Sequence, residues 1–412
     1  MISFANDAGH AILHRVLADL ITGELRAHRG RAPDLPTRLW SHGLVLGGDA
    51  LPIDSLEMLA ISGAVNEMFH LHTGGREDML LARRRLSDWV GEVARAWPGR
   101  DNRRITFKTS GSTGAPKPVT HDLDTLLAEV HVHRTHLRPG RILSAVPGHH
   151  IYGFIFTGLL PRFAEIDVVD VRDDLNALAR AAPDDLIVAT PDVWDYVARG
   201  FGTLPPATGV SSTAPLSSTT ARRLVERGLD RVVEIYGATE VGAIGWRDDP
   251  DAAFRLFPGW HVQAGPMPGS DVPRPLTLVG RAGTPVLAPN MVTRPDAGSL
   301  CVGPRHDGAV QIGGYNVDLA DLRAHLEAHP QIAEVRVTAV PTGNDGALRL
   351  EAAVTPTPAA EQAGIALADW PAKVATWLTG RVDPRAQPTA VYLAPPSPTR
   401  ATRADGGSEG AS

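Results

Sequence analysis

Short apolar segments alternate with helical segments along the middle of the chain, and this alternation limits the possible folds. The segments that we expect to be strands are Leu143 to Val146, Glu165 to Val171, Leu186 to Ala189 and Arg231 to Ile235. The segments that we expect to be helices are Leu126 to His133, Val193 to Ala198 and Thr219 to Glu226. Strands that alternate with helices favour a mainly parallel sheet with helices packed on it. The sequence therefore predicts an α/β domain.

The flanking regions have different patterns. Residues 10–100 are expected to be largely helical, because apolar residues recur there at helical spacing. Residues 256–300 are rich in Pro, Gly, Val and Leu and predict short strands without a long helix. After Arg305, three short strands and one helix predict a small α+β unit. We expect a large N-terminal α/β domain over 1–303 and a small mobile C-terminal domain over 304–412, which ends in a disordered tail from Pro395.

Composition argues against several classes of protein. A net charge of −6 gives no general attraction to nucleic acid or to an anionic membrane. The single cysteine, Cys301, excludes an internal disulfide framework and fits a reducing cytoplasm. The first seven residues lack the pattern of a signal peptide, and the longest uncharged apolar stretch, Ile151 to Pro161, is too short to span a bilayer. We therefore expect a cytoplasmic protein without a nucleic-acid or membrane partner.

A loop rich in glycine and hydroxyl groups follows the short apolar segment at Ile105. Its hydroxyl groups and glycines are those of Thr109, Ser110, Gly111, Ser112, Thr113 and Gly114, and Lys117 adds a positive charge. Glycines allow successive backbone N–H groups to converge on an anion. The spacing differs from that of a Walker loop. The segment is thus interpreted as a phosphate-binding loop, with a polar surface loop as the alternative.

Two further segments carry candidate site residues at expected strand ends. In Pro147 to Phe154, two histidines and a tyrosine lie beside glycines and could line a pocket for a flat aromatic ligand; the alternative is a core turn that contains histidine. In Glu234 to Glu240, Tyr236 could stack on an aromatic base, Thr239 could hold a phosphate and Glu240 could bind Mg²⁺, which prefers oxygen ligands. A strand followed by a capped turn is the structural alternative for this second segment.

These three segments occur in the same order and at similar spacing in the adenylate-forming superfamily, which the chain resembles over about residues 100–405. The superfamily includes acyl-CoA synthetases, aryl-CoA ligases and peptide-synthetase adenylation domains. The compact length and the run Val210 to Leu216 look most like the short 4-coumarate:CoA ligases that activate the chromophore of photoactive yellow protein. The resemblance implies ATP and Mg²⁺ as cofactors, coenzyme A as a candidate acceptor, and an aromatic acid as substrate.

The resemblance also implies a role for individual residues. Thr109 to Lys117 would hold the pyrophosphate part of ATP. The residues near the reacting carboxylate would be His149, His150, Tyr152 and Gly153, with His150 counted among the catalytic group together with Lys117, Thr239 and Glu240. The nucleotide would contact Ser212, Thr213, Ala214 and Pro215, where the family more often has a glycine pair, and Tyr236, Gly237 and Ala238. Arg305 would hold the ribose, Asp307 would be the hinge between the domains, and Asp296 is the candidate for the ribose-binding aspartate.

One departure from the family pattern concerns lysine. The chain has only three lysines, Lys108, Lys117 and Lys373, and none stands where the family's C-terminal Pro-Arg-x-x-x-Gly-Lys motif places its catalytic lysine. Aligning Pro396 with the first residue of that motif puts Thr402 at the lysine position. Arg400 and Arg403 are the candidates for the missing charge, although Arg and Lys differ in reach and geometry.

Three functions remain open at this point. The first is an AMP-forming ligase that activates a hydroxycinnamate-type acid and transfers it to a thiol of coenzyme A or of a carrier protein. The second is an ATP-dependent diazotase that activates nitrite and diazotises an aminocoumarate-type arylamine. The third is a nucleotide-binding regulator that has lost catalysis, for which the missing lysine is the sole argument.

Overall fold

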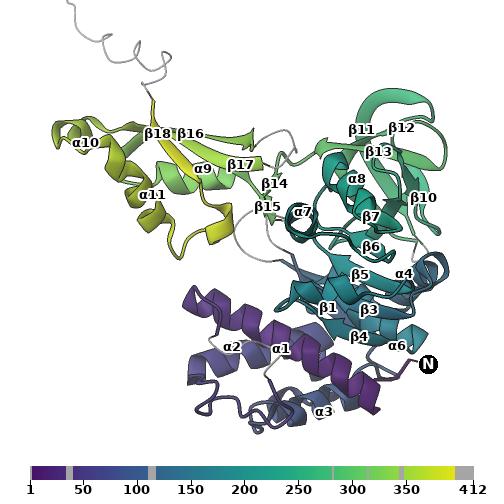
Figure 1. Cartoon of the computed structure of the whole chain (residues 1–412). Coiled ribbons are helices and arrows are strands. Elements are labelled where there is room, and N and C mark those ends of the chain that lie inside the picture. Colours follow the sequence, from purple (N-terminus) through teal and green to yellow (C-terminus); the bar gives the residue numbers. More distant parts are fainter. Residues whose placement is uncertain are drawn as a thin grey trace, which may run out of the picture. The chain divides into compact units, whose positions relative to one another are not determined.

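The computed structural model describes residues 2–33, 40–109, 117–280, 283–312, 315–342 and 348–394. The chain divides into two compact units, and the boundary lies between Asp307 and Gly308. The sequence analysis placed this boundary four residues earlier. Both units combine helices with sheets, which confirms the predicted fold class (Figure 1). The predicted tail beyond Pro395 lies outside the described residues.

Three helices of the first unit precede the large sheet. The helices of this unit are α1 (Asp7–Arg29), α2 (Ser55–Phe69), α3 (Leu86–Ala96), α4 (Leu123–Leu137), α5 (Ile151–Phe154), α6 (Leu160–Ala164), α7 (Pro191–Gly200) and α8 (Ser218–Glu226). A π-helical turn, η4 (Ile155–Leu159), joins α5 to α6. The sequence sets the ends of α1, because the Asn6 side chain caps its first turn and Gly30 ends it with φ of 71°.

A single large sheet forms the centre of the first unit. Its strands are β3 (Arg141–Ser144), β4 (Asp167–Asp170), β5 (Asp185–Ala189), β6 (Thr208–Ser211), β7 (Arg231–Ala238), β8 (Gly242–Arg247), β9 (Phe254–Leu256), β10 (His261–Ala264), β11 (Ser270–Val279), β12 (Pro285–Arg294) and β13 (Ser299–Arg305). They follow the order β10-β11-β12-β13-β9-β8-β7-β6-β5-β3-β4. The strands from β4 to β7 pair in parallel and the others pair antiparallel, so the sheet is mixed.

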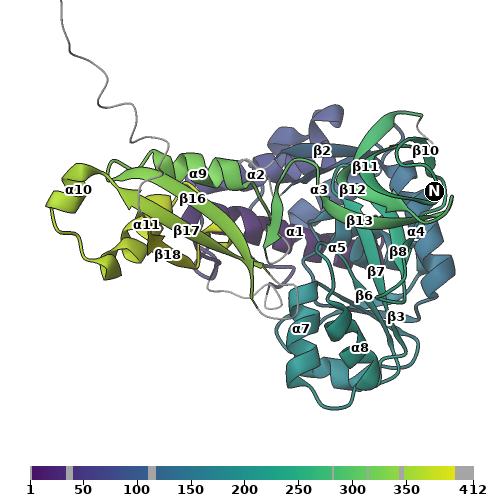
Figure 2. The same cartoon turned by 90° about the horizontal axis from the view of Figure 1, so that it is seen from above.

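Helices cover both faces of the parallel half of the sheet. Alternate residues of a strand point to opposite faces, and Ile142 packs into the core beside α1, α4 and α5 while Leu143 packs into the core beside α7 and α8. Figure 2 shows α7 and α8 on one side of these strands. Strands buried on both faces are expected to be almost continuously apolar, which is why residues 185–189 were recognisable as a strand from the sequence.

A separate hairpin precedes the sheet, and it carries the predicted phosphate loop. Its strands are β1 (Arg104–Lys108) and β2 (Pro118–Asp122), which pair antiparallel from Arg104 with Asp122 to Lys108 with Pro118. Ile105 and Phe107 are buried in the same core as α1 and α2. The hairpin is therefore anchored by its apolar side chains.

The second unit has its own core and two small sheets. Its elements are β14 (Val310–Ile312), β15 (Tyr315–Val317), α9 (Leu319–Glu327), β16 (Ile332–Pro341), β17 (Leu348–Pro356), α10 (Pro358–Gln362), α11 (Trp370–Leu378) and β18 (Ala390–Leu393). Strands β16, β17 and β18 form one sheet, and α9 and α11 pack against it through Leu322, Leu326 and Val374. These elements confirm the predicted small α+β unit.

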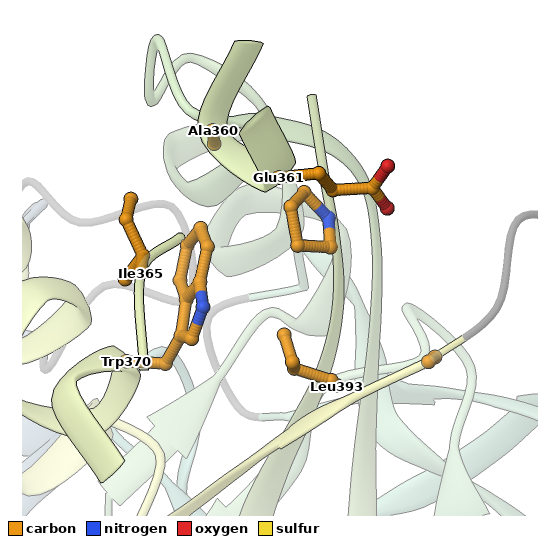
Figure 3. Close-up of a pocket in the computed structure, with 7 residues that line it drawn as sticks. Ala360, Glu361, Ile365, Trp370 and Leu393 are labelled. Carbon is orange, nitrogen blue, oxygen red and sulfur yellow. The ribbon is translucent and has the colours of Figure 1, made fainter. Parts of the chain in front are cut away.

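A pocket with a volume of about 360 Å³ lies beside α10 and α11 in the second unit (Figure 3). The residues that line it are Pro356, Ala360, Glu361, Ile365, Trp370, Leu393 and Ala394. Figure 3 shows the Glu361 carboxylate pointing away from Trp370 and Ile365, so the walls near the indole ring are apolar. None of the predicted site residues lines this pocket. Within the described residues, none of the helices combines the length and apolar character that crossing a bilayer requires.

Candidate active site

The predicted site segments leave the sheet at one edge. Strands β3, β6 and β7 belong to its parallel half, so the segments that follow them emerge at the same, carboxyl end. After β3 the chain continues to the edge strand β4, and from β5 it proceeds through β6 and β7 in the opposite direction. Ligands of open α/β sheets bind where the strand order reverses in this way. His149 and His150 lie in the loop after β3, which is at this reversal.

The phosphate-loop hairpin is closed at its base by one backbone hydrogen bond and one hydrogen bond from the backbone to a side chain. The Thr109 N–H donates to the Lys117 carbonyl at 2.9 Å, and the Lys117 N–H donates to Oγ1 of Thr109 at 3.3 Å. Lys117 is exposed and stands at the start of β2. Ser110, Gly111, Ser112, Thr113 and Gly114 lie outside the described residues. The structure thus fixes the two ends of the predicted loop.

The three lysines have different surroundings. Lys108 lies at the end of β1, where its ammonium group contacts the carboxylates of Glu24 at 2.8 Å and Glu67 at 3.7 Å. Lys373 belongs to the second unit, and its Nζ lies 3.4 Å from Oε1 of Gln331. Lys117 also adjoins the predicted phosphate loop, and it forms no ion pair with the described residues. Arg400 and Arg403 lie outside that part.

His121 joins the hairpin to the turn that carries Thr239 and Glu240. Nε2 of His121, on β2, donates to the Thr239 carbonyl at 2.6 Å. Burial lowers the pKa of His121, so the imidazole is neutral at pH 7 and its one proton lies on Nε2. From the other side, the Ala243 N–H donates to Oε2 of Glu129 at 3.0 Å. The turn between β7 and β8 is thus held at both ends by side chains from outside the two strands.

The residues before this turn are partly buried. Tyr236 packs against Phe254 with ring centroids 5.7 Å apart, and its hydroxyl donates to Oδ1 of Asn290 at 3.3 Å. Gly237 and Ala238 complete β7, and a Cβ on Gly237 would lie 2.3 Å from the Gly242 carbonyl oxygen. Only glycine therefore allows β7 and β8 to approach this closely. Thr239 and Glu240 follow in the turn, and Glu240 is exposed.

The carboxylate of Glu240 is the candidate ligand for magnesium. Its carboxylate is on the surface of the turn, and no group of three or more His, Cys, Asp or Glu side chains that could hold a metal ion is found within the described residues. Mg²⁺ in phosphoryl-transfer sites is usually bound by one or two carboxylates together with phosphate oxygens. Glu240 offers one exposed carboxylate of this kind.

The segment after β6 is attached to β7 by hydrogen bonds, one of which is accepted by a glutamate that is paired with an arginine. Oγ of Ser212 donates to the Ile235 carbonyl at 2.9 Å, and the Leu216 N–H donates to Oε1 of Glu234 at 2.9 Å. Glu234 also pairs with Arg247 at 2.6 Å. Burial raises the pKa of Glu234, whereas Arg247 and the Leu216 N–H oppose that shift. Ser212, Thr213, Ala214 and Pro215 therefore form a loop with both ends fixed to β7.

Thr213 within this loop has an unusual backbone. Its φ is 81°, a value that disfavours every residue with a Cβ and most of all a β-branched one. The family that the sequence resembles more often has glycines here. Residue 213 therefore has a backbone conformation that suits glycine, although the residue is a threonine.

The loop after β3 brings His149 and His150 together. Their ring centroids are 4.0 Å apart, and His150 is exposed. Burial lowers the pKa of His149 well below its usual value, and the neighbouring His150 adds to the shift. A Cβ on Gly153 would lie 1.9 Å from the Pro147 carbonyl oxygen, so glycine is required for the chain to fold back over this loop.

Tyr152 is buried on α5, after the loop that carries the two histidines. Its hydroxyl is within hydrogen-bonding distance of two main-chain carbonyls, those of Ala189 at 3.1 Å and Val210 at 3.0 Å. The side chain is buried, and burial raises the pKa of its phenol well above the usual value. The hydroxyl thus holds the carboxyl ends of β5 and β6, and a contact with an acid would have to come from the ring.

The three remaining predicted residues lie on or after β13 and in the turn before it. Arg305 pairs with Asp307 through Nε to Oδ1 at 2.9 Å and Nη2 to Oδ2 at 2.5 Å. Asp307 is the last residue of the first unit. Asp296 lies in the turn between β12 and β13, where its Oδ1 accepts from the Gly298 N–H at 2.7 Å.

Asp296 and Arg305 are far apart along one hairpin. Arg305 is opposite Asn290 in the register of β12 with β13, and Asp296 lies beyond the last residue of β12. Asp296 therefore lies in the turn at the end of this hairpin, whereas Arg305 lies opposite a residue inside β12.

Four residues that the sequence analysis left without a role hold the site in place. His121 and Glu129 fix the Thr239–Glu240 turn, Glu234 fixes the segment after β6, and Asp19 of α1 accepts a hydrogen bond from the Gly148 N–H at 2.7 Å. Glu234 and Asp19 each interrupt an apolar run, which is the one sequence signal that could have singled them out. Glu129 also follows an apolar run, Leu126 to Ala128, whereas His121 carries no such signal.

Comparison with known proteins agrees with this arrangement. Residues 54–317 match the family model described as AMP-binding enzyme. The chain is 36% identical over 348 residues to a 4-coumarate–CoA ligase of Halorhodospira halophila, with 83% of this chain and 86% of the relative covered. It is 34% identical over 332 residues to a 4-coumarate–CoA ligase of Rhodobacter capsulatus, with 78% and 83% covered.

Solved structures show the same fold at low sequence identity. An o-succinylbenzoate CoA synthetase from Bacillus subtilis superposes with a TM-score of 0.63 at 15% identity and covers 95% of this chain and 90% of its own. An amide bond synthetase from Marinactinospora thermotolerans superposes with a TM-score of 0.61 at 16% identity, with 95% and 92% covered.

Proposed function

The chain belongs to the AMP-binding enzyme family and is an AMP-forming acid–thiol ligase, and from this premise we propose that it activates a hydroxycinnamate-type aromatic acid and transfers it to coenzyme A. The observation that carries the proposal is the bond from His121 to the Thr239 carbonyl, which holds the hairpin of the phosphate loop beside the Thr239–Glu240 turn. The 4-coumarate–CoA ligases similar to the chain support a hydroxycinnamate as the acid.

The reaction has two steps. In the first, a carboxylate oxygen of the acid attacks the α-phosphorus of ATP, the bond from that phosphorus to the bridging oxygen breaks, and pyrophosphate leaves. In the second, the thiol of coenzyme A loses its proton, its sulfur attacks the acyl carbon, and AMP leaves with the carboxylate oxygen. Neither step needs an oxidant or a reductant. Positioning and charge stabilisation supply the catalysis in transfers of this kind.

We assign the roles within this reaction as follows. Lys117 and the backbone N–H groups of the phosphate loop bind the pyrophosphate part of ATP, and Thr239 binds phosphate. Tyr236 and the Ser212–Pro215 loop contact the adenine, and Arg305 contacts the ribose. His150, exposed at the end of β3, binds the carboxylate of the acid. Mg²⁺ held by Glu240 would neutralise charge on the phosphate oxygens. Asp307 is proposed as the hinge to the second unit.

One experiment separates this function from the diazotase. The enzyme is incubated with ATP, Mg²⁺ and 3-amino-4-hydroxycinnamate, once with coenzyme A and once with nitrite. We expect AMP and a coenzyme A thioester in the first incubation and no effect of nitrite in the second. Nitrite-dependent AMP release with loss of the arylamine would establish the diazotase instead, and failure to form AMP with any acid would favour the silent regulator.

A second arm of the experiment tests the role of Glu240. Glu240→Gln should abolish Mg²⁺-dependent AMP release and leave the melting temperature unchanged, because an amide is a weaker ligand than a carboxylate and the side chain is exposed. Glu226→Gln changes an equally exposed glutamate at the end of α8 and serves as the control. Wild-type activity of Glu240→Gln at limiting Mg²⁺ would refute the assignment.

A further inference from the structure

Helix α1 precedes residue 54, where the match to the family model begins, and yet it contacts two loops of the candidate site. We propose that α1 is a positioning element for the acid-binding loop and the phosphate-loop hairpin, through Asp19, Gly23 and Glu24. This inference rests on the proposed function for the role of the loops, but not for the contacts themselves. Asp19 and Gly23 are four residues apart and share one face of the helix, whereas Glu24 follows Gly23 about 100° further around the helix axis.

Asp19 fixes the main chain of the acid-binding loop. Its Oδ2 accepts from the Gly148 N–H at 2.7 Å, one residue before His149, and its Oδ1 pairs with Nη1 of Arg172 at 2.7 Å. Arg172 also pairs with Asp170 at the end of β4. A carboxylate that is only 2% exposed is costly to bury unless it is paired in this way. Asp19 therefore ties the loop after β3 to the end of β4 as well as to α1.

Gly23 fixes the side chain of His149, one helical turn later. A Cβ at Gly23 would lie 3.1 Å from Nε2 of His149, which is closer than an ordinary contact. Nδ1 of His149 is buried and has no hydrogen-bond partner within the described residues. The ring thus contacts both Gly23 and the His150 ring. A side chain at residue 23 would displace His149, and His149 would displace His150.

Glu24 connects the same helix to the phosphate-loop hairpin. Its carboxylate lies 2.8 Å from Nζ of Lys108, the residue that precedes Thr109. The two loops that would bind the acid and the pyrophosphate are therefore attached to neighbouring residues of one 23-residue helix. Misplacing a reacting group by about 1 Å can reduce a rate by roughly 100-fold, which gives α1 a measurable effect on catalysis without contact with either substrate.

The test compares variants of α1 with variants that make the same chemical change elsewhere. Asp185 is the control for Asp19, because it is also buried, pairs with an arginine and accepts a backbone N–H, but it stands at the amino end of β5. Gly63 is the control for Gly23, because it is also helical and a Cβ there would contact nothing within 4 Å. The variants are Asp19→Ala, Asp185→Ala, Gly23→Ala and Gly63→Ala.

We expect the variants to differ in how they change the melting temperature and how they change kcat/KM. Asp19→Ala and Asp185→Ala should lower the melting temperature by similar amounts, but only Asp19→Ala and Gly23→Ala should reduce kcat/KM for the aromatic acid, by about 10- to 100-fold. Gly63→Ala should leave kcat/KM unchanged and raise the melting temperature slightly, because alanine is favoured over glycine inside a helix. Glu24→Gln should raise KM for ATP more than KM for the acid. Equal kinetics of Asp19→Ala and Asp185→Ala, or wild-type kinetics of Gly23→Ala, would overturn the proposal.

A readout that does not need activity separates this inference from the proposed function. Side-chain NMR of histidine reports the surroundings of each imidazole, and Gly23→Ala should shift the resonances of His149 and His150 while leaving that of His329 in the second unit in place. If the wild type releases no AMP with any aromatic acid but this shift occurs, the proposed function fails and the contact of α1 with the loop stands. If the resonances of His149 and His150 do not move, α1 does not position them.

Discussion

Thr213 has a backbone conformation that disfavours its own side chain, with φ of 81°. Replacement by glycine should remove this strain, whereas replacement by alanine should keep it because a Cβ remains. We expect Thr213→Gly to be more stable than Thr213→Ala by about 1 kcal/mol. Thermal unfolding of the two variants tests this directly, since both lose the hydroxyl group. An alanine variant as stable as the glycine variant would show that the conformation is not strained.

Lys117 gives a second test at the level of one residue. It is exposed at the base of the predicted phosphate loop, so its truncation removes little packing. Lys117→Ala should lower the rate of AMP release by at least about tenfold, as for the loss of one charge-stabilising donor, with a small change in melting temperature. Arg100→Ala removes an equally exposed cation as a control. A large fall in melting temperature with unchanged turnover would show that the lysine is structural.

The residues of the site differ in how far the sequence could identify them. The glycines and hydroxyl groups around the phosphate loop are adjacent in sequence, so their pattern is visible without a structure. His121 and Thr239 are 118 residues apart and meet only because β2 and the end of β7 are brought together by the fold. Tyr152 shows the converse, because its motif suggested a substrate contact while its hydroxyl bonds to the carbonyls of Ala189 and Val210.

At the scale of the elements, β2 connects two parts of the site through His121. His121→Ala should remove the donor to the Thr239 carbonyl and raise KM for MgATP by about tenfold, since one lost bond to a partly buried carbonyl costs about 1–3 kcal/mol. KM for the acid should change less. His121→Gln retains an N–H group and should restore part of the effect. If the alanine and glutamine variants have identical kinetics, the hydrogen bond does not position the turn.

A helix or strand was predictable where the pattern of apolar residues in the sequence reflects how the element is packed. Strand β5 is buried at every residue and was apparent as an apolar run. Strand β6 was not predicted, because it is four residues long and contains Gly209. A Cβ at Gly209 would lie 3.0 Å from the Trp194 ring, so the glycine serves the close approach of α7 to the sheet. Such a reason is visible only once the helix and the strand are seen together.

At the scale of the whole molecule, the chain consists of two units with separate cores, and the sequence showed this division through the change from α/β to shorter α+β patterns. The exact boundary was not visible, because Arg305 continues strand β13 and Asp307 pairs with it. Both residues belong to the first unit, which ends at Asp307.

Buried histidines make the stability of the protein depend on pH. Burial is the main cause that lowers the pKa of six of them below the usual value of 6.5: His14, His70, His121, His136, His149 and His329. Below about pH 6.5 the unfolded chain binds protons at these residues while the folded chain does not, so their contribution to stability is lost as the pH falls. The hydrogen bond from Arg29 lowers the pKa of Glu57 to about 2, so the contribution of this carboxylate to stability is lost only as the pH falls below about 4.5.

His136 isolates this effect, because it packs against Trp246 with ring centroids 3.9 Å apart and lies outside the predicted site. His136→Phe keeps an aromatic ring that cannot be protonated. The melting temperature of the wild type should therefore fall more between pH 7.5 and pH 5.5 than that of the variant. An equal fall in both proteins would show that His136 is not kept neutral by burial.

Acid-dependent exchange of labelled pyrophosphate into ATP measures the adenylation step itself. With 4-hydroxycinnamate, ATP and Mg²⁺ and without coenzyme A, we predict exchange that requires the acid, because the first step is reversible and releases pyrophosphate. Addition of coenzyme A should then yield AMP and the thioester in equal amounts. Absence of acid-dependent exchange, or formation of ADP in place of AMP, would contradict the account.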